Sequence, residues 1–322
     1  MYTQSPPLFE APLAHEATYY TNPYRNTEYY SYPELAHEFE EEVQEGSNYA
    51  PVLGEEEWEA IGEFEALTRP MPSLGGLPGF TPAEVKALRI TSSFETGRPL
   101  GFGGLTGDFD GMGLSFGLMQ WNFGSGSLQP LLLEFAQRHL QRFNTIFGSD
   151  ASRFLQILHQ SRKVQMHFVR SINDKRKRIV EPWASRFGHL ANDPLFRSIQ
   201  LRHIRRSMNA AVNHAKRLGL RSERGLALMF DTVTQNGAAW PQVRNRAALI
   251  KQRSAAFRQR MGQPPAEREF LEIIANVIAD TVNPRWSADV RRRRMTIVRG
   301  RGRVHGDNLD LGRKFRLTDQ PF

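Results

Sequence analysis

Three carboxylates near the first glycine-rich stretch have residue types and spacing suited to acid–base chemistry. Glu95 lies at the expected end of a helix, and Asp108 and Asp110 follow it by 13 and 15 residues in an expected hairpin. A carboxylic acid on one side of a cleft can protonate a leaving oxygen while a carboxylate opposite activates water, as in glycosidases. We expect Glu95 to be the general acid and one aspartate the general base. A one-residue change in hairpin register exchanges Asp108 and Asp110, so both stay open.

Local signals predict the helix that positions Glu95. At Thr81–Glu84 an N-cap threonine, a proline in the first turn and a glutamate three residues after the cap coincide, and Gly97 marks the expected end. One face begins apolar and ends at the carboxylate; it carries Val85, Leu88, Ser92 and Glu95. Partial burial and the helix dipole there favour a carboxyl group that can donate a proton. The alternative is an exposed Glu95 at a frayed helix end.

The segment 101–127 contains nine glycines and predicts a strand, a tight turn near Asp110–Gly113 and a second strand. Glycine at this density lets the backbone approach a bound polymer closely. Trp121 and Asn122 lie at the expected end of the hairpin, where they can stack on and hydrogen-bond a sugar. The alternative is that they pack under the hairpin.

The glycine-rich segment also resembles a known motif. Asp110-Gly-Met-Gly-Leu-Ser-Phe-Gly-Leu-Met-Gln-Trp-Asn-Phe-Gly-Ser-Gly-Ser127 is similar, without a gap, to a run in chitosanases of the lysozyme superfamily. Its Gly-Leu-Met-Gln part, residues 117–120, resembles lytic transglycosylases and goose-type lysozymes. The resemblance implies a lysozyme-like α+β domain, predominantly α, with two lobes, a small β-hairpin and a glycan cleft. It extends loosely through Gly225–Gly237.

The same resemblance implies roles for individual residues. Glu95 would be the general acid and Asp110 the general base of an inverting hydrolysis, with the Ser115 hydroxyl orienting the water. If Glu95 alone works, the enzyme is instead a lytic transglycosylase. The residues expected to bind the glycan are Gln120, Trp121, Asn122 and Ser127.

Two departures from the chitosanase motif change the expected substrate. Met112 replaces an arginine, and Ser127 replaces the aspartate that meets the cationic sugar. Residues 68–322 carry a net charge of +22, which disfavours a polycationic substrate and favours a polyanionic partner. We therefore expect a muramidase-like enzyme that cleaves β-1,4 bonds of peptidoglycan. A chitosanase, or a non-catalytic module that binds cell wall or nucleic acid, remains the alternative.

The first 67 residues differ from the rest in composition, because they contain 15 Glu and one basic residue. We expect residues 1–70 to be a disordered acidic leader and linker, and residues 71–322 to be the catalytic domain. The leader is weakly similar to those on cargo of bacterial contractile injection systems, which implies docking to export machinery. The alternative is a tail that shields the basic domain. The start lacks a Sec signal, so we expect a protein secreted or delivered to the envelope by a non-Sec route, as an effector or a wall-remodelling enzyme.

Other chemistries find little support in the sequence. There is no cysteine, no run long enough to span a membrane and no His-Glu-x-x-His pattern, so we expect no metal or cofactor. Gly113–Gly117 matches a serine-hydrolase elbow, with Asp231 and His305 following, but the β-like sequence continues where that motif needs a helix. Basic clusters at 175–178, 202–206 and 291–294 lack a nucleic-acid-binding motif, so we interpret them as solvated helix faces.

Overall fold

A computed structural model describes residues 77–322 of the chain, so the expectations for residues 1–70 lie outside the described residues. The described part is mostly helical with two small antiparallel sheets, which confirms the predominantly helical α+β class. Its helices are α4 Pro82–Thr96, α5 Gln129–Arg138, α6 Leu140–Phe147, α7 Ala151–Leu158, α8 Arg162–Ser171, α9 Trp183–Asn192, α10 Pro194–Arg217, α11 Glu223–Asn236, α12 Arg246–Met261, α13 Glu267–Asp280, α14 Pro284–Arg299 and α15 Leu311–Phe315. Its strands are β1 Leu105–Thr106, β2 Ser115–Phe116, β3 Trp121–Asn122, β4 Arg301–Val304 and β5 Asp307–Asp310. None of these helices is long and apolar enough to cross a membrane.

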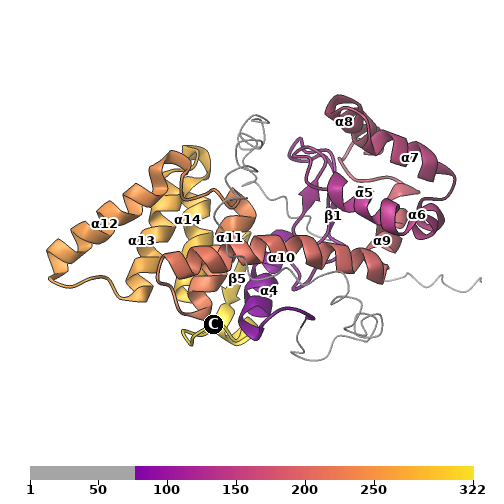
Figure 1. The fold of residues 1–322 in the computed structure, drawn as a ribbon. Helices are drawn as coiled ribbons and strands as arrows, with labels where there is room; N and C mark the ends of the chain where they lie inside the picture. The colour runs from indigo at the N-terminus through magenta and orange to yellow at the C-terminus, as the bar shows by residue number, and fades with distance from the viewer. Residues whose placement is uncertain (1–76) are drawn as a thin grey trace, which may run out of the picture.

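Two separate hydrophobic cores divide the described residues into two lobes. The smaller lobe packs the β1–β3 sheet against α5–α9, and the larger one packs α4 and α11–α15 with the β4–β5 hairpin (Figure 1). Helix α10 runs through both: Phe196 and Ile199 belong to the smaller core, and Ile204 and Met208 to the larger. A single continuous helix thus fixes how the lobes face each other.

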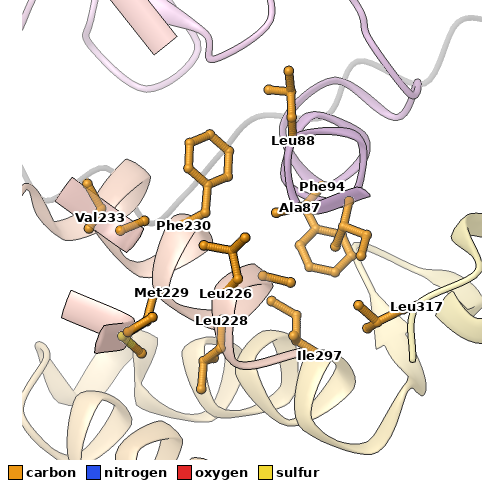
Figure 2. Close-up of a cluster of buried hydrophobic side chains, with 14 of the residues drawn as sticks. Ala87, Leu88, Phe94, Leu226, Leu228, Met229, Phe230, Val233, Ile297 and Leu317 are labelled. Atoms are coloured by element: carbon orange, nitrogen blue, oxygen red, sulfur yellow. The ribbon is translucent and has the colours of Figure 1, made fainter. Parts of the chain in front are cut away.

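The larger core is centred on the contact between α4 and α11. Ala87, Leu88 and Phe94 of α4 lie against Leu226 and Phe230 of α11, and all are buried (Figure 2). This contact places the C-terminal end of α4, where Glu95 lies, beside the middle of α11. It joins segments that are far apart in the sequence.

Helix α4 begins and ends where the sequence predicts. The Thr81 hydroxyl accepts from the Glu84 amide, the Glu84 carboxylate accepts from the Thr81 amide, and Gly97 ends the helix in the left-handed region at φ 71°. The predicted hairpin is also present, because β1 pairs with β2 and β2 with β3.

Two details of the predicted pattern differ. The apolar residues from Leu128 to Phe143 have the three-and-four spacing that predicts a helix. They do not form one helix, because the chain leaves helical geometry at His139, where φ is −138°, and Leu140 is exposed. The arginine-rich segment 298–306 predicts a flexible phosphate-binding tail or a loop that closes the cleft. It instead completes α14 and then forms strand β4, paired with β5.

Candidate active site between the lobes

Glu95 lies in the last turn of α4 with a side chain that is almost completely buried. Its Oε1 accepts a hydrogen bond from Nη2 of Arg293 on α14 at 2.7 Å. The frayed, exposed alternative for Glu95 is therefore wrong. Instead the carboxylate is fixed by a cation, so its orientation is set before any substrate arrives.

Arg293 also binds Asp231 of α11. Its Nη2 lies 2.6 Å from Oδ1 of Asp231, and its Nε lies 3.1 Å from Oδ2. Arg294 donates to the same carboxylate and to the Asn236 side chain. Two carboxyl groups and two guanidinium groups, all buried, thus form one hydrogen-bonded network.

This network corrects two interpretations made from the sequence. Arg293 and Arg294 were expected on a solvated helix face, yet both are 1% exposed or less because each pairs with a buried carboxylate. Asp231 was considered as a member of a serine-hydrolase triad, whereas it holds the two arginines. Ser115 is followed by a turn and strand β3, not by the helix that the elbow requires.

The two candidate bases differ sharply in environment. Asp108 is buried: its Oδ1 accepts from the Gly113 amide at 2.7 Å and its Oδ2 lies 3.2 Å from Nε of Arg170. Asp110 is exposed, and its Oδ1 accepts from the Met112 amide at 3.0 Å. Asp108 therefore shapes the β1–β2 loop, which presents Asp110 to solvent.

Ser115 and Gln120 belong to the sheet that carries this loop. Ser115 is a buried residue of β2, paired with Thr106 on one side and Asn122 on the other. The Gln120 amide donates to the carbonyls of Gly104 and Gly117, and its Oε1 accepts from the Thr106 hydroxyl. Gln120 therefore holds the sheet together, and its predicted role as a glycan ligand stays a prediction.

Asn122 and Ser127 close the loop after β3. The Asn122 Oδ1 accepts from the Ser125 amide at 2.7 Å, and the Asn122 backbone amide donates to the Ser127 hydroxyl at 2.9 Å. Asn122 is fully buried, whereas Ser127 is partly exposed. Of these two residues, only Ser127 is accessible to a ligand in solution.

Trp121 lies at the junction of the lobes, because it packs against both cores while staying partly exposed. It borders a groove of about 280 Å³ between β3, α10 and the end of α11. The groove is lined by Met119, Trp121, Ser127, Ile204, Arg206, Ser207, Ala210, Val233, Thr234, Gly237 and Ala238. Two predicted glycan ligands, Trp121 and Ser127, thus meet in one depression.

The turn between β4 and β5 covers the end of α4 from the other side. His305, at φ 50°, lines a small cavity of about 10 Å³ with Phe94 and Gly97. Burial lowers the pKa of His305 below its ordinary value of 6.5, Arg293 lowers it further, and Glu95 opposes the shift. Neutral His305 adds no positive charge beside Arg293. The sequence suggested His305 only as a member of the serine-hydrolase triad.

Arg293 and Arg294 are the functional candidates that the sequence did not indicate. Arg293 is 198 positions from Glu95 and 62 from Asp231, so no local spacing signals these contacts. The sequence shows only a run of four arginines at 291–294 and does not distinguish the two that are buried. Within residues 77–322 no group of three or more histidines and carboxylates is arranged to hold a metal ion.

The chain matches no protein-family model and no curated protein sequence. Solved structures similar to it include a GH46 chitosanase from Gynuella sunshinyii in complex with chitotetraose, at 17% identity, 70% coverage of this chain, 96% of that chain and a TM-score of 0.48. A Bacillus subtilis chitosanase complexed with GlcN units has 20% identity, 73% and 100% coverage and a TM-score of 0.47. A further chitosanase complex has 20% identity, 71% and 97% coverage and a TM-score of 0.49. Chitosanases are also the family that residues 110–127 resemble.

Proposed function

We propose that this chain is a glycoside hydrolase that cleaves β-1,4 bonds of peptidoglycan, with Glu95 as general acid and Asp110 as general base. One observation carries the proposal: helix α4, which ends with a buried carboxyl group held by Arg293, approaches a hairpin whose loop exposes a second carboxylate. The packing of Thr96 supports this neighbourhood. A Cβ on Gly104, at the start of the hairpin, would lie 3.0 Å from Cγ2 of Thr96.

The chemistry follows from these two positions. Glu95 donates its proton to the glycosidic oxygen as the bond to the anomeric carbon breaks. Asp110 takes a proton from water, and the resulting hydroxide attacks that carbon from the opposite face, so the configuration inverts. Ser115, by the motif resemblance, orients this water.

The buried network supports the proton transfer from Glu95. Glu95 becomes an anion as it loses its proton, and Arg293 already donates a hydrogen bond to it. This preorganised donor stabilises the charge that develops in the transition state. Asp231 holds Arg293 in place through two contacts, so the guanidinium has no other orientation open to it.

Charge favours peptidoglycan as the substrate. The folded part is strongly basic, Ser127 lacks the carboxylate that meets a cationic sugar in chitosanases, and Ser127 borders the groove. Peptidoglycan carries carboxylates on its peptides, and on those lactyl groups that have no peptide attached. Chitosan is the second candidate, because the motif at 110–127 resembles that of chitosanases.

The release of reducing ends from peptidoglycan, chitin and chitosan by the full-length protein tests the proposal. We expect the fastest release from peptidoglycan and none from the Glu95→Gln variant. Faster release from chitosan would move the assignment to a chitosanase. Binding of cell walls without product, unaffected by Glu95→Gln, would show a non-catalytic module instead.

A further inference from the structure

The groove beside Trp121 contains a charge that the proposed chemistry does not use. Of its lining residues only Arg206 carries a charge, and none of the described residues that line it is acidic. At about 280 Å³ the groove is at the low end of the roughly 300–1,000 Å³ range of small-ligand sites. It therefore suits a small part of a polymer, such as a sugar ring with its substituent.

Arg206 is not neutralised by its neighbours. The nearby carboxylate of Glu134 already binds Arg138, Arg202 and His203. Within residues 77–322 Arg206 forms no ion pair, and its side chain is exposed. The pKa of His203 agrees with this excess of positive charge: burial lowers it most, Glu134 raises it, and Arg206 and Arg202 lower it again.

The other groups of the groove are neutral and suit a carbohydrate. Trp121 offers a partly exposed ring against which a sugar can stack. Ser127, Ser207 and Thr234 offer hydroxyl groups on three sides, from the loop after β3, from α10 and from α11. An aromatic ring, hydroxyl groups and one unpaired guanidinium together match a sugar that carries a carboxylate.

We propose that this groove is the subsite for an acidic substituent of the glycan, with Arg206 as the residue that selects a carboxylate-bearing sugar over a neutral or cationic one. The inference rests on the proposed function, because it names a feature of the proposed glycan substrate. Thr234 connects the two places: it lines the groove and lies one turn after Asp231 on α11. A sugar in the groove would therefore contact α11, the helix whose Asp231 binds Arg293.

A matched pair of ligands tests the inference on the full-length Glu95→Gln variant, which should bind substrate without cleaving it. One ligand is the GlcNAc–MurNAc tetrasaccharide, whose lactyl groups carry free carboxylates. The other is N-acetylchitotetraose, which has the same β-1,4 backbone without them. Calorimetry should show tighter binding of the acidic tetrasaccharide. Arg206→Ala should weaken its binding roughly tenfold and leave the neutral ligand within about twofold, as expected for a lost charge-assisted hydrogen bond.

The control is Arg217→Ala, which removes the same charge from an exposed position at the end of α10, outside the groove lining. We expect it to leave both affinities unchanged. An equal loss with both variants, an equal loss for both ligands, or no binding of either ligand would overturn the inference.

Different results would contradict this inference and the proposed function. If the unsubstituted protein cleaves peptidoglycan but Arg206→Ala leaves the preference for the acidic ligand intact, the groove assignment is wrong and the hydrolase stands. If carboxylate binding depends on Arg206 but no glycan is cleaved, the groove assignment stands and the hydrolase proposal is wrong.

Discussion

Nη2 of Arg293 donates a hydrogen bond to Oε1 of Glu95 at 2.7 Å, although the two residues are 198 positions apart in the chain. Both side chains are only 1% exposed, so water does not screen their interaction. The same guanidinium also binds Asp231. Arg293 therefore joins α4, α11 and α14 at the point where the proposed general acid lies.

We predict that Arg293→Met strongly destabilises the protein, because it leaves two buried carboxylates short of a cation. Breaking such a network typically costs about 3–5 kcal/mol. The matched control is Arg292→Met on the same helix. Arg292 is exposed and, among the described residues, pairs only with Asp289, so its loss should cost about 1 kcal/mol or less. Denaturant unfolding measures the free energy of unfolding of both variants. Equal losses would show that the buried network stabilises the protein no more than the exposed ion pair does.

Substitutions at Asp108 and Asp110 should separate structure from catalysis. Asp108→Asn weakens the contacts to Gly113 and Arg170, so we expect a loss of about 1–3 kcal/mol in stability. Asp110→Asn should leave the unfolding free energy within about 0.5 kcal/mol, since the residue is exposed, and should abolish turnover. Unfolding curves and initial rates measure the two effects. Full activity of Asp110→Asn would remove Asp110 as the base.

The approach of the hairpin to α4 can be tested at Gly104. A Cβ there would lie 2.6 Å from Nε2 of Gln120 and 3.0 Å from Cγ2 of Thr96, so Gly104→Ala pushes the hairpin away from the helix that carries Glu95. We expect a loss of about 1–3 kcal/mol in stability and a lower kcat.

Gly188→Ala is the control for this substitution. Its Cβ meets nothing within 4 Å and lies within α9, so it should stabilise the protein by about 0.5–1 kcal/mol. If both variants behave alike, the close approach at Gly104 has no consequence.

The stability of the protein should depend on pH through its partly buried histidines. Burial lowers the pKa of His203, His214 and His305 below the ordinary 6.5, so the unfolded chain binds protons more readily than the folded one. Their contribution is present above pH 6.5 and is lost as the pH falls from there towards the folded pKa values. We expect Tm to fall between pH 7.5 and 5.5, and less so in His305→Gln. An unchanged pH dependence in this variant would contradict the role of His305.

Local signals were sufficient for the elements that position Glu95. Thr81, Pro82, Glu84 and Gly97 act within α4 itself, so its start and end can be read from adjacent residues. The hairpin follows equally from its glycines. The position of Asp110 on an exposed loop, with Asp108 buried beneath it, needed the structure, because Arg170 and Asn173 hold Asp108 from a distant helix end.

The contacts between segments far apart in the chain could not be predicted from the sequence. Arginines occupy positions 291–294, so the sequence does not distinguish the buried Arg293 and Arg294 from the more exposed Arg291 and Arg292. The packing of α14 on α11 buries the second pair. No glycine or proline stands next to His139 to predict the break between α5 and α6 there. The β4–β5 hairpin lies in an arginine-rich segment that lacks an alternating apolar pattern, so its strands gave little signal.

Mass spectrometry of the soluble products released from purified peptidoglycan tests the central claim most directly. The full-length protein should release muropeptides with ordinary reducing ends, because in the proposed mechanism Glu95 protonates the leaving oxygen while Asp110 activates water. The variants Glu95→Gln and Asp110→Asn should release none. Anhydro-muropeptides would contradict a two-carboxylate hydrolase and indicate a lytic transglycosylase that relies on Glu95 alone. Reducing-end products from the Asp110→Asn variant would show that Asp110 is not the base.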